Sequence, residues 1–406
     1  MNEHKRRDLP RRRRGQPTFN LSARLRHIPR VLAAGSRPHA ERRDRTAALH
    51  EPALRYQLGE RLGAGGMAEV YRGKMIGAEG FERTVAIKRI LPRMSDEPGF
   101  VRQFVQEAQV ISRLSHPNIV NVLDFHRDAR GQLFLVLEFV DGLDLDQLLE
   151  SGPLPHSVII FLVSEILSGL AYAHHLPGRD WVRGVVHRDV SPHNVLVSWE
   201  GAVKLSDFGL AKPRETSSVS VHAFEGKVAF TSPEQVNRER LDERSDLFSV
   251  GVMLWEMLTD KRLFWHEDTN AAIRRVLELQ VPRPSTMRHV PRDLENVAMK
   301  LLKRKRARRY RTAEAAIEAL AACAASSSNG RAELVRLLVE RFPQRALRLG
   351  GQPVPLRQER RDWRTRTAPS DLLPCRRSRP STLRRCLRWW WGLVTGVADS
   401  LVRGAS

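Results

Sequence analysis

Apolar residues along the chain follow two spacings, one typical of β-strands and one typical of helices. Strand-like runs occupy 84–90 ("TVAIKRI") and 132–140 ("QLFLVLEFV"), and two more flank a Gly-rich turn within 56–73. Between them, residues 100–114 place apolar side chains at helical intervals, at 101, 104, 105, 108, 111 and 114. The first part of the sequence therefore predicts a small strand-rich lobe with one amphipathic helix.

After Gly142 the spacing becomes mostly helical. Residues 156–176 place one apolar face on Ile159, Ile160, Val163, Ile166, Leu167 and Leu170. Two short strand-like runs, "NVLVS" and "AVKLS", flank the turn Trp199-Glu200-Gly201. Further helical patterns cover 245–259, 292–303, 312–322 and, after a Ser-rich break, 331–342. The pattern predicts a short hinge near 138–142 followed by a larger, mainly helical lobe.

Charge is concentrated at the two ends of the chain, although the net charge is +22. Residues 1–55 contain 15 basic and 5 acidic side chains and residues 343–406 contain 14 and 4, so the middle is nearly neutral. Both ends are rich in Arg and lack sustained periodicity, as disordered segments do. We expect a disordered basic tail at 1–55, a folded domain at 56–322, and a basic tail with short amphipathic helices at 323–406.

The basic tails do not predict specific nucleic-acid recognition, because Arg runs such as 11–14 lack interleaved aromatic residues. Non-specific, salt-sensitive binding is expected of such charge. In the C-terminal tail, Trp390, Leu393, Val394, Val397 and Leu401 follow helical spacing behind an Arg cluster. This pattern favours peripheral contact with an anionic membrane, while a partner-docking helix and a poorly ordered tail are the alternatives.

Cysteine use and hydropathy indicate the cytoplasm. Cys323, Cys375 and Cys386 fit neither a zinc spacing nor a disulfide framework. The N-terminus has Arg clusters but lacks the apolar core of a secretory signal. No run reaches the roughly 18 apolar residues that a membrane-spanning helix needs.

Candidate chemistry begins with "LGAGGMAEV", where glycines between two strands let backbone N–H groups approach phosphates. The third position of a G-x-G-x-x-G pattern is Ala68, so the match is incomplete, and a simple tight turn is the alternative. Lys88 lies within a strand and requires a partner if it is buried. Glu107, on the predicted helix, is the candidate, although a surface Lys and a solvated Glu explain the same letters.

The run "HRDVSPHN" favours a functional role for the Gly-rich turn and Lys88, because Asp189 and Asn194 are followed by "DFG" at 207–209. A carboxylate such as Asp189 can accept a hydroxyl proton. The oxygens of Asn194 and Asp207 are ligands of the kind that magnesium prefers. Their order, after a Gly-rich loop and a strand Lys, points to phosphoryl transfer.

Residues 56–322 resemble the protein kinase family, specifically the eukaryotic-like serine/threonine kinases of bacteria. The resemblance rests on "GAGGMAEV", "VAIK", "HRDVSPHN", "DFG", "SPE", "DLFSVG" and "RRYRTAEAA". It implies an α+β, two-lobed fold, with a small antiparallel sheet and one helix in 56–138 and a mainly helical lobe in 143–322. It also implies transfer of the ATP γ-phosphate to Ser or Thr of protein substrates, with Mg²⁺ or Mn²⁺.

The resemblance assigns a role to each matching residue. Asp189 would orient and deprotonate the acceptor hydroxyl, Lys88 would bind phosphates and pair with Glu107, and the metal ligands would be Asn194 and Asp207. The nucleotide would contact Leu62, Gly63, Ala64, Gly65, Gly66, Val70, Ala86, Lys88, Glu138, Val140 and Leu196, with Leu137 before the hinge. Glu234 and Arg309 would form a buried ion pair, and Asp246 would brace the catalytic loop.

Two positions depart from the family. Most serine/threonine kinases have Lys where this chain has Ser191, and Gly-Thr where it has Gly226-Lys227. One hypothesis is a swap, in which Lys227 supplies the missing cation and Ser191 the hydroxyl. The alternative is that Lys227 points to solvent and that Lys88, Asn194 and the metal suffice. A pseudokinase or ATP-binding scaffold is the rival function, favoured only by Ser191 and Ala68.

Regulation is expected in the segment after "DFG". In the family, the Arg at position 188 often pairs with a phosphate on this segment, because a guanidinium suits a dianion. The candidates for autophosphorylation are Thr216, Ser217, Ser218 and Ser220. The alternative is a flexible polar loop whose hydroxyls are incidental.

Overall fold

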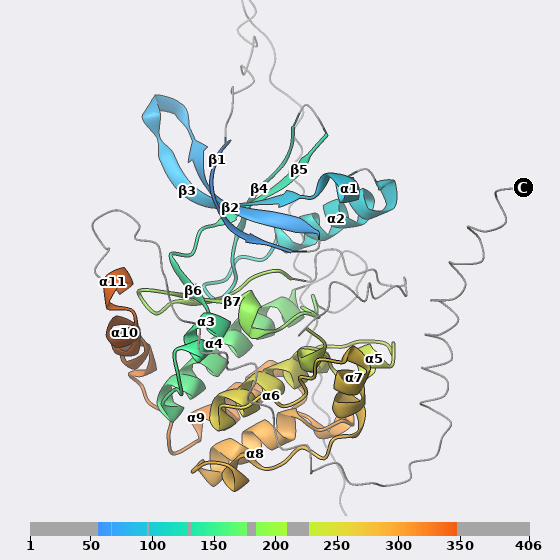
Figure 1. Ribbon diagram of the computed structural model, residues 1–406, viewed down its shortest axis with the longest axis vertical. Coiled ribbons are helices and arrows are strands. Elements are labelled where there is room, and N and C mark those ends of the chain that lie inside the picture. The colour runs from blue at the N-terminus through green and yellow to red at the C-terminus, as the bar shows by residue number, and fades with distance from the viewer. Residues whose placement is uncertain are drawn as a thin grey trace, which may run out of the picture. The chain divides into compact units, whose positions relative to one another are not determined.

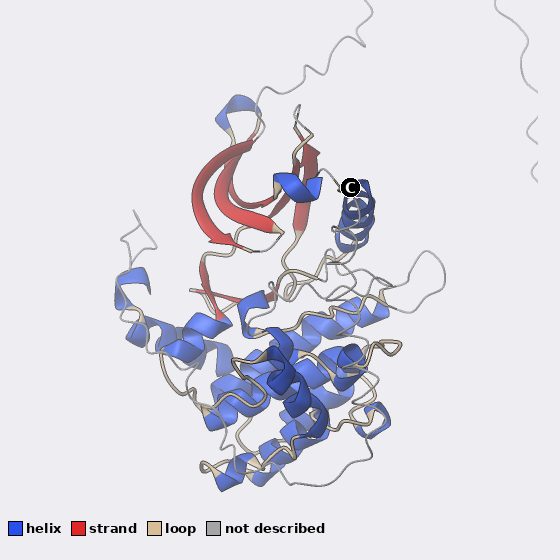
Figure 2. Ribbon diagram, turned by 45° about the vertical axis from the view of Figure 1, so that its right-hand side comes forward, coloured by secondary structure: helices blue, strands red, loops and turns tan. Residues whose placement is uncertain are grey.

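A computed structural model describes residues 56–65, 67–95, 97–128, 131–176, 184–208 and 227–346. All of these belong to one compact unit, Ala53–Ser406. Strands gather in the first part of the described chain and helices in the second (Figure 2).

The first part is built on a five-stranded antiparallel sheet (Figure 1). Its order is β1–β2–β3–β5–β4, with bounds β1 Tyr56–Ala64, β2 Ala68–Ile76, β3 Glu82–Ile90, β5 Leu133–Glu138 and β4 Val122–Arg127. Helix α1 (Pro92–Ser95) leads into α2 (Pro98–Ile111), which has Pro at its start, where the missing N–H costs nothing.

Alternation along β3 sorts its side chains between the two faces of the sheet. Val85 and Ile87 pack with Val136 on one face. Ile90 packs with Phe104 of α2 and Leu135 of β5 on the other. Because side chains alternate along a strand, Lys88 projects on the same face as Ile90, the face that α2 covers.

The second part is mainly helical. Its three-stranded sheet pairs β6 (Gly142–Asp144), β7 (Val195–Ser198) and β8 (Val203–Leu205) in that order. The helices are α3 Leu145–Glu150, α4 His156–His175, α5 Pro233–Val236, α6 Arg244–Thr259, α7 Thr269–Glu278, α8 Arg292–Leu301, α9 Ala313–Ala321, α10 Gly330–Arg341 and α11 Pro343–Ala346. Helix α6 is buried on all sides from Ser245 to Thr259, as expected of a helix at the centre of a fold.

Helix α4 packs against α6, α9 and α10. It is the one helix among the described residues whose length and apolar composition would allow it to cross a membrane. The core helix of a folded domain has the same properties, and 56 % of the relevant window is buried. Helix α4 is therefore weak evidence for a membrane span.

The predicted elements are present with small shifts at their ends. The helix expected at 100–114 runs from Pro98 to Ile111, and Leu114 is buried in the turn that follows. The strand expected at 132–140 ends at Glu138, so residues 139–141 connect the two parts. The helix expected at 331–342 is α10, and it packs against α4 beyond the predicted domain boundary at 322, which stays a prediction.

Candidate active site

The loop that carries Asp189 is hydrogen-bonded to helix α6. Asp246, in the first turn of α6, accepts hydrogen bonds from the backbone N–H groups of His187 and Arg188, both at 2.8 Å. His174 of α4 contacts the same carboxylate, with 2.8 Å from its Nε2. The predicted brace is therefore present. Burial opposes ionisation of Asp246, but these hydrogen bonds and the neighbouring histidines outweigh it and lower its pKa.

Asn194 is tied to Asp189 directly. Its Nδ2 donates to the Asp189 carbonyl oxygen at 2.7 Å and to Asp189 Oδ2 at 3.2 Å. The backbone of Asn194 in turn accepts from the Ser206 N–H at 2.8 Å. Asn194 directly precedes β7 and Asp207 follows β8 by two residues, so this short hairpin brings all three candidate residues together.

Lys88 reaches Asp207 from the other sheet, with 2.7 Å between Nζ and Oδ1. Asp207 has a left-handed backbone (φ 57°), as does Arg188 (φ 65°), a conformation that non-glycine residues rarely adopt. The structure thus brings Lys88, Asp189, Asn194 and Asp207 into one site. The predicted partner Glu107 lies on α2, but its side chain lies outside the described residues.

The site offers oxygen ligands of the right kind for a divalent ion. Because Nδ2 of Asn194 is engaged with Asp189, the amide presents its oxygen as the remaining acceptor. Asp207 supplies a carboxylate. Within the described part of the chain no group of three or more His, Cys, Asp and Glu residues could form a metal cage. Two oxygen ligands from the protein suit magnesium, which usually completes its shell with waters and phosphates.

The Gly-rich loop and the hinge flank this site. A Cβ at Gly63 would meet no atom within 4 Å, so open space lies beside that backbone; Gly66 lies outside the described residues. Val70 pairs with Lys88, and Ala86 pairs with Leu137 next to the hinge. The Glu138 carboxylate accepts from Asn121 and, at 3.0 Å, from Lys204 of β8. The Lys204 contact connects the hinge to the three-stranded sheet.

The remaining predicted nucleotide contacts lie on the same two sheets and their connection. Leu62 and Ala64 lie at the end of β1, Gly65 follows it, and all three are exposed. Val140 follows β5 in the hinge, and Leu196 lies on β7 opposite Lys204. Their role as nucleotide contacts stays a prediction.

Of the two positions that depart from the family, the structure describes the side chain of Ser191 but not that of Lys227. Ser191 is 2 % exposed, and its hydroxyl has no hydrogen-bond partner among the described residues. Lys227 begins the short turn Lys227–Phe230, but its side chain lies outside the described residues. So do the candidate phosphorylation sites Thr216, Ser217, Ser218 and Ser220.

Glu234 and Arg309 form the predicted buried ion pair. The guanidinium contacts both carboxylate oxygens, at 2.6 and 2.8 Å, and Ser245 donates to Glu234 at 2.8 Å. Burial opposes ionisation of Glu234, but the Arg309 hydrogen bonds and charge outweigh it and lower its pKa. The pair fixes α5, which follows the segment that contains Lys227.

Sequence reasoning missed Gln235, which donates to the Arg188 carbonyl beside Asp189, and His174, which contacts the bracing residue Asp246. Gln235 had a signal: Ser232 followed three residues later by Gln is a capping-box pattern. His174 had none, because its contact with Asp246 spans 72 residues.

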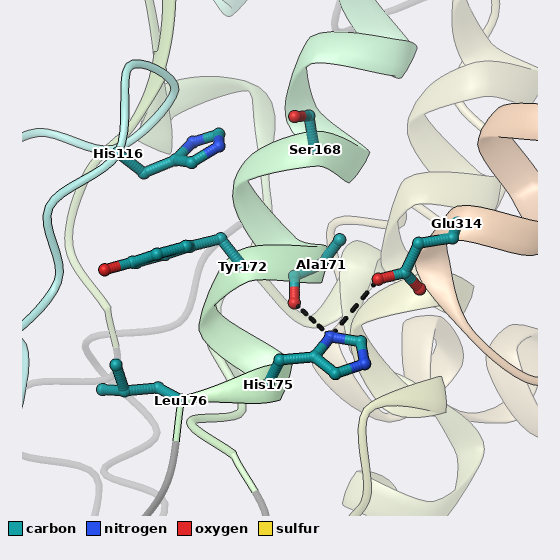
Figure 3. Close-up of a pocket in the computed structure, with 7 residues that line it drawn as sticks. All are labelled: His116, Ser168, Ala171, Tyr172, His175, Leu176 and Glu314. Atoms are coloured by element: carbon teal, nitrogen blue, oxygen red, sulfur yellow. Dashed lines mark hydrogen bonds and ion pairs between the residues drawn. The ribbon is translucent and has the colours of Figure 1, made fainter.

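A pocket of about 380 Å³ lies elsewhere, at the C-terminal end of α4 (Figure 3). It is lined by His116, Ser168, Ala171, Tyr172, His175, Leu176 and Glu314. His175 contacts Glu314 at 3.3 Å and the Ala171 carbonyl at 2.8 Å, and Tyr172 stacks on His116. None of the predicted site residues lines this pocket, so it is separate from the candidate active site.

Residues 56–320 match the family described as the protein kinase domain. The chain belongs to the protein kinase family. It resembles the tyrosine-protein kinase MasK of Myxococcus xanthus (36 % identical over 67 % of this chain and 43 % of MasK). It also resembles the probable serine/threonine-protein kinase PknB of Lactococcus lactis (34 % over 69 % and 44 %) and the serine/threonine-protein kinase PknL of Mycobacterium tuberculosis (37 % over 57 % and 56 %).

Among solved structures, the kinase domain of Mycobacterium tuberculosis PknI has a similar fold. It superposes with a TM-score of 0.51 at 26 % identity, covering 66 % of this chain and 95 % of the PknI domain. The chain spans only about half the length of the curated relatives named above. The predicted α+β, two-lobed kinase fold is confirmed.

Proposed function

We propose that the protein is an ATP-dependent serine/threonine protein kinase of the eukaryotic-like bacterial type. The observation that carries the proposal is the Lys88–Asp207 contact at 2.7 Å, next to Asn194 bound to Asp189. Protein kinases mainly position reactants and neutralise charge, and this cluster has the groups that both tasks need.

In the proposed reaction, Asp189 accepts the proton of the substrate hydroxyl as its oxygen attacks the γ-phosphorus of ATP. The bond between that phosphorus and the bridging oxygen breaks, and ADP leaves. Lys88 binds the phosphates, and Asn194 and Asp207 would hold Mg²⁺, or Mn²⁺ in its place. The metal supplies positive charge to the phosphates.

The acceptor residue is proposed as Ser or Thr, and the substrate as a protein. MasK is named a tyrosine kinase, whereas PknB and PknL are named serine/threonine kinases. The catalytic loop "HRDVSPHN" lacks the Ala-Ala-Arg run that resembles tyrosine kinases, which supports Ser or Thr. The pseudokinase alternative has little support, since Lys88, Asp189, Asn194 and Asp207 are all present.

The test is transfer of radiolabelled phosphate from ATP to the protein itself and to a generic protein substrate, followed by phosphoamino-acid analysis. We expect label on Ser or Thr that requires a divalent ion and disappears in Asp207→Asn. Label on Tyr alone would overturn the acceptor assignment, and no transfer by the wild-type protein would overturn the kinase assignment.

Activation by autophosphorylation is part of the proposal. Arg188 lies beside the catalytic Asp189, where a guanidinium would pair with a phosphate on the segment that holds Thr216, Ser217, Ser218 and Ser220. Mass spectrometry of protein incubated with ATP should find phosphate between 216 and 220. Its absence from an active preparation would contradict this mode of regulation.

We also propose a cytoplasmic location, which the cysteine usage supports, with the C-terminal tail in peripheral contact with an anionic membrane. Specific nucleic-acid binding is not proposed, because the central domain is nearly neutral.

A further inference from the structure

The residue before the candidate catalytic Asp has an unusual backbone. Arg188 adopts φ 65°, in the left-handed region that residues with a side chain rarely occupy. Such a conformation persists only where the surroundings hold it. Because Asp189 follows directly, the direction of its side chain depends on what holds the peptide groups on either side of Arg188.

Two side chains hold these groups from opposite ends. Asp246 accepts from the Arg188 N–H at 2.8 Å. Gln235 donates from Nε2 to the Arg188 carbonyl oxygen at 2.9 Å. That carbonyl belongs to the peptide bond that joins Arg188 to Asp189. Gln235 therefore hydrogen-bonds to the peptide group that directly precedes the Cα atom of Asp189.

The amide of Gln235 has its orientation fixed by its own helix. Its Oε1 accepts from the Ser232 N–H at 3.0 Å and from the Ser232 hydroxyl at 2.9 Å. This is a capping box, with Ser232 as N-cap of α5 and Gln235 three residues later. Because the oxygen is occupied, the NH₂ group must face Arg188. Helix α5 is itself anchored by the Glu234–Arg309 ion pair.

We propose that Gln235 is a positioning residue that couples the end of the activation segment to the catalytic loop. It acts through the Arg188 carbonyl and does not touch substrate. When α5 is in place, the Arg188–Asp189 peptide is held in the orientation seen here. When α5 shifts, that peptide loses its donor. The proposal rests on the proposed kinase function.

The discriminating variant is Gln235→Glu. A glutamate keeps the acceptor oxygen that the capping box needs, and Glu is a favoured residue at this position. It replaces the donor facing Arg188 with an oxygen, which repels the carbonyl. The matched control is Ser232→Ala, which removes the hydroxyl of the cap but keeps the Ser232 N–H that holds Oε1, so the Arg188 contact stays in place.

For Gln235→Glu we expect kcat to fall roughly ten- to hundredfold, because small misplacements of catalytic groups have effects of that size, while KM for ATP and Tm stay unchanged. Hydrogen exchange of the 187–190 amides should become faster in this variant. Ser232→Ala should show the opposite split, with a lower Tm, wild-type kcat and wild-type exchange at 187–190.

Wild-type kcat in Gln235→Glu would overturn the proposal. A fall in kcat accompanied by a clear fall in Tm would also overturn it, because that would mean a general structural role. If the wild-type protein transfers no phosphate, the kinase assignment fails. The exchange measurement then still decides whether Gln235 anchors the loop, because faster exchange in Gln235→Glu alone supports the anchor and unchanged exchange rejects it.

Discussion

At the scale of single residues, Ser191 is the position in the candidate site that departs most clearly from the kinase pattern. Ser191 stands where a cation is usual, and its buried hydroxyl has no partner among the described residues. An unmet buried hydroxyl is costly, so a hydroxyl at this position needs a reason. The swap hypothesis gives one, because it assigns Ser191 the role of the missing Thr and Lys227 that of the missing Lys.

Lys227→Met tests the swap. Losing one preorganised charge at a transferring phosphate typically costs on the order of 10²–10³ in turnover, or roughly 3–4 kcal/mol. We expect kcat to fall by that amount with KM for ATP little changed, and Ser191→Lys introduced into the same protein to restore part of it. Steady-state kinetics with a peptide substrate measures both. Near-normal turnover in Lys227→Met would end the swap idea.

The Glu234–Arg309 pair allows a prediction about pH. Removing Arg309 leaves a buried carboxylate without its cation, which typically costs about 3–5 kcal/mol at neutral pH. In the wild type the pKa of Glu234 is lowered, so its contribution to stability is present above the unfolded value and is lost as pH falls through the folded pKa. In Arg309→Met, burial would instead raise that pKa.

The stability gap between wild type and Arg309→Met should therefore be largest near pH 7 and narrow toward pH 4–5, where the variant takes up a proton at Glu234. Urea unfolding at both pH values measures it. The control is Arg308→Met, at the exposed neighbouring position, which should change stability by less than about 0.5 kcal/mol. A gap that stays constant with pH would show that Glu234 does not titrate as argued.

At the level of elements, α10 extends the folded region past the end of the family match at 320. Arg341 donates to Ser151, Gly152 and Pro153 in the α3–α4 connection. Near the middle of α10, a Cβ at Gly201 would approach Val335 to 2.9 Å, so the β7–β8 turn packs closely against the helix. This turn joins β7, which begins directly after Asn194, to β8, which ends two residues before Asp207, so α10 supports the hairpin of the candidate active site.

Two neighbouring residues of α10 make a matched pair. Leu338 is 0 % exposed and Val339 is 49 % exposed. Leu338→Asp should lower the free energy of unfolding by several kcal/mol, since a buried charge has no partner there, while Val339→Asp should change it by less than about 0.5 kcal/mol. Chemical denaturation gives both values. Equal effects would mean that α10 is not docked as described.

At the scale of the whole molecule, much of the fold and site could be predicted because the signals are local. Helical and strand spacings predicted the two lobes to within a few residues. Lys88, Asp189, Asn194 and Asp207 stood out because their residue types and order leave few other chemistries. Local spacing could not predict that Lys88 contacts Asp207, since that contact joins residues 119 apart in the sequence.

The parts that could not be predicted depend on long-range geometry. Gln235 is an ordinary polar residue until its helix places it beside Arg188, 47 positions earlier. Arg341 is one of many arginines near a basic tail, and only its contacts with the α3–α4 connection distinguish it. In both cases the residue type carries little information, and the side chain acquires its role only when the backbone brings two distant segments together.

The tails lead to the last prediction. Residues 343–406 carry 14 basic and 4 acidic side chains, and Trp390 lies on the expected apolar face. An interfacial helix needs both apolar burial and charge, so the full chain should float with phosphatidylserine-containing vesicles at low salt and not with neutral ones. A chain ending at Ala346 should lose this binding, and Trp390→Ser should weaken it although the charge is unchanged.

Binding that does not depend on Trp390 but is abolished by salt would mean that charge alone holds the tail on the membrane. The absence of flotation would reject membrane contact and leave the two alternatives, a partner-docking helix and a poorly ordered tail.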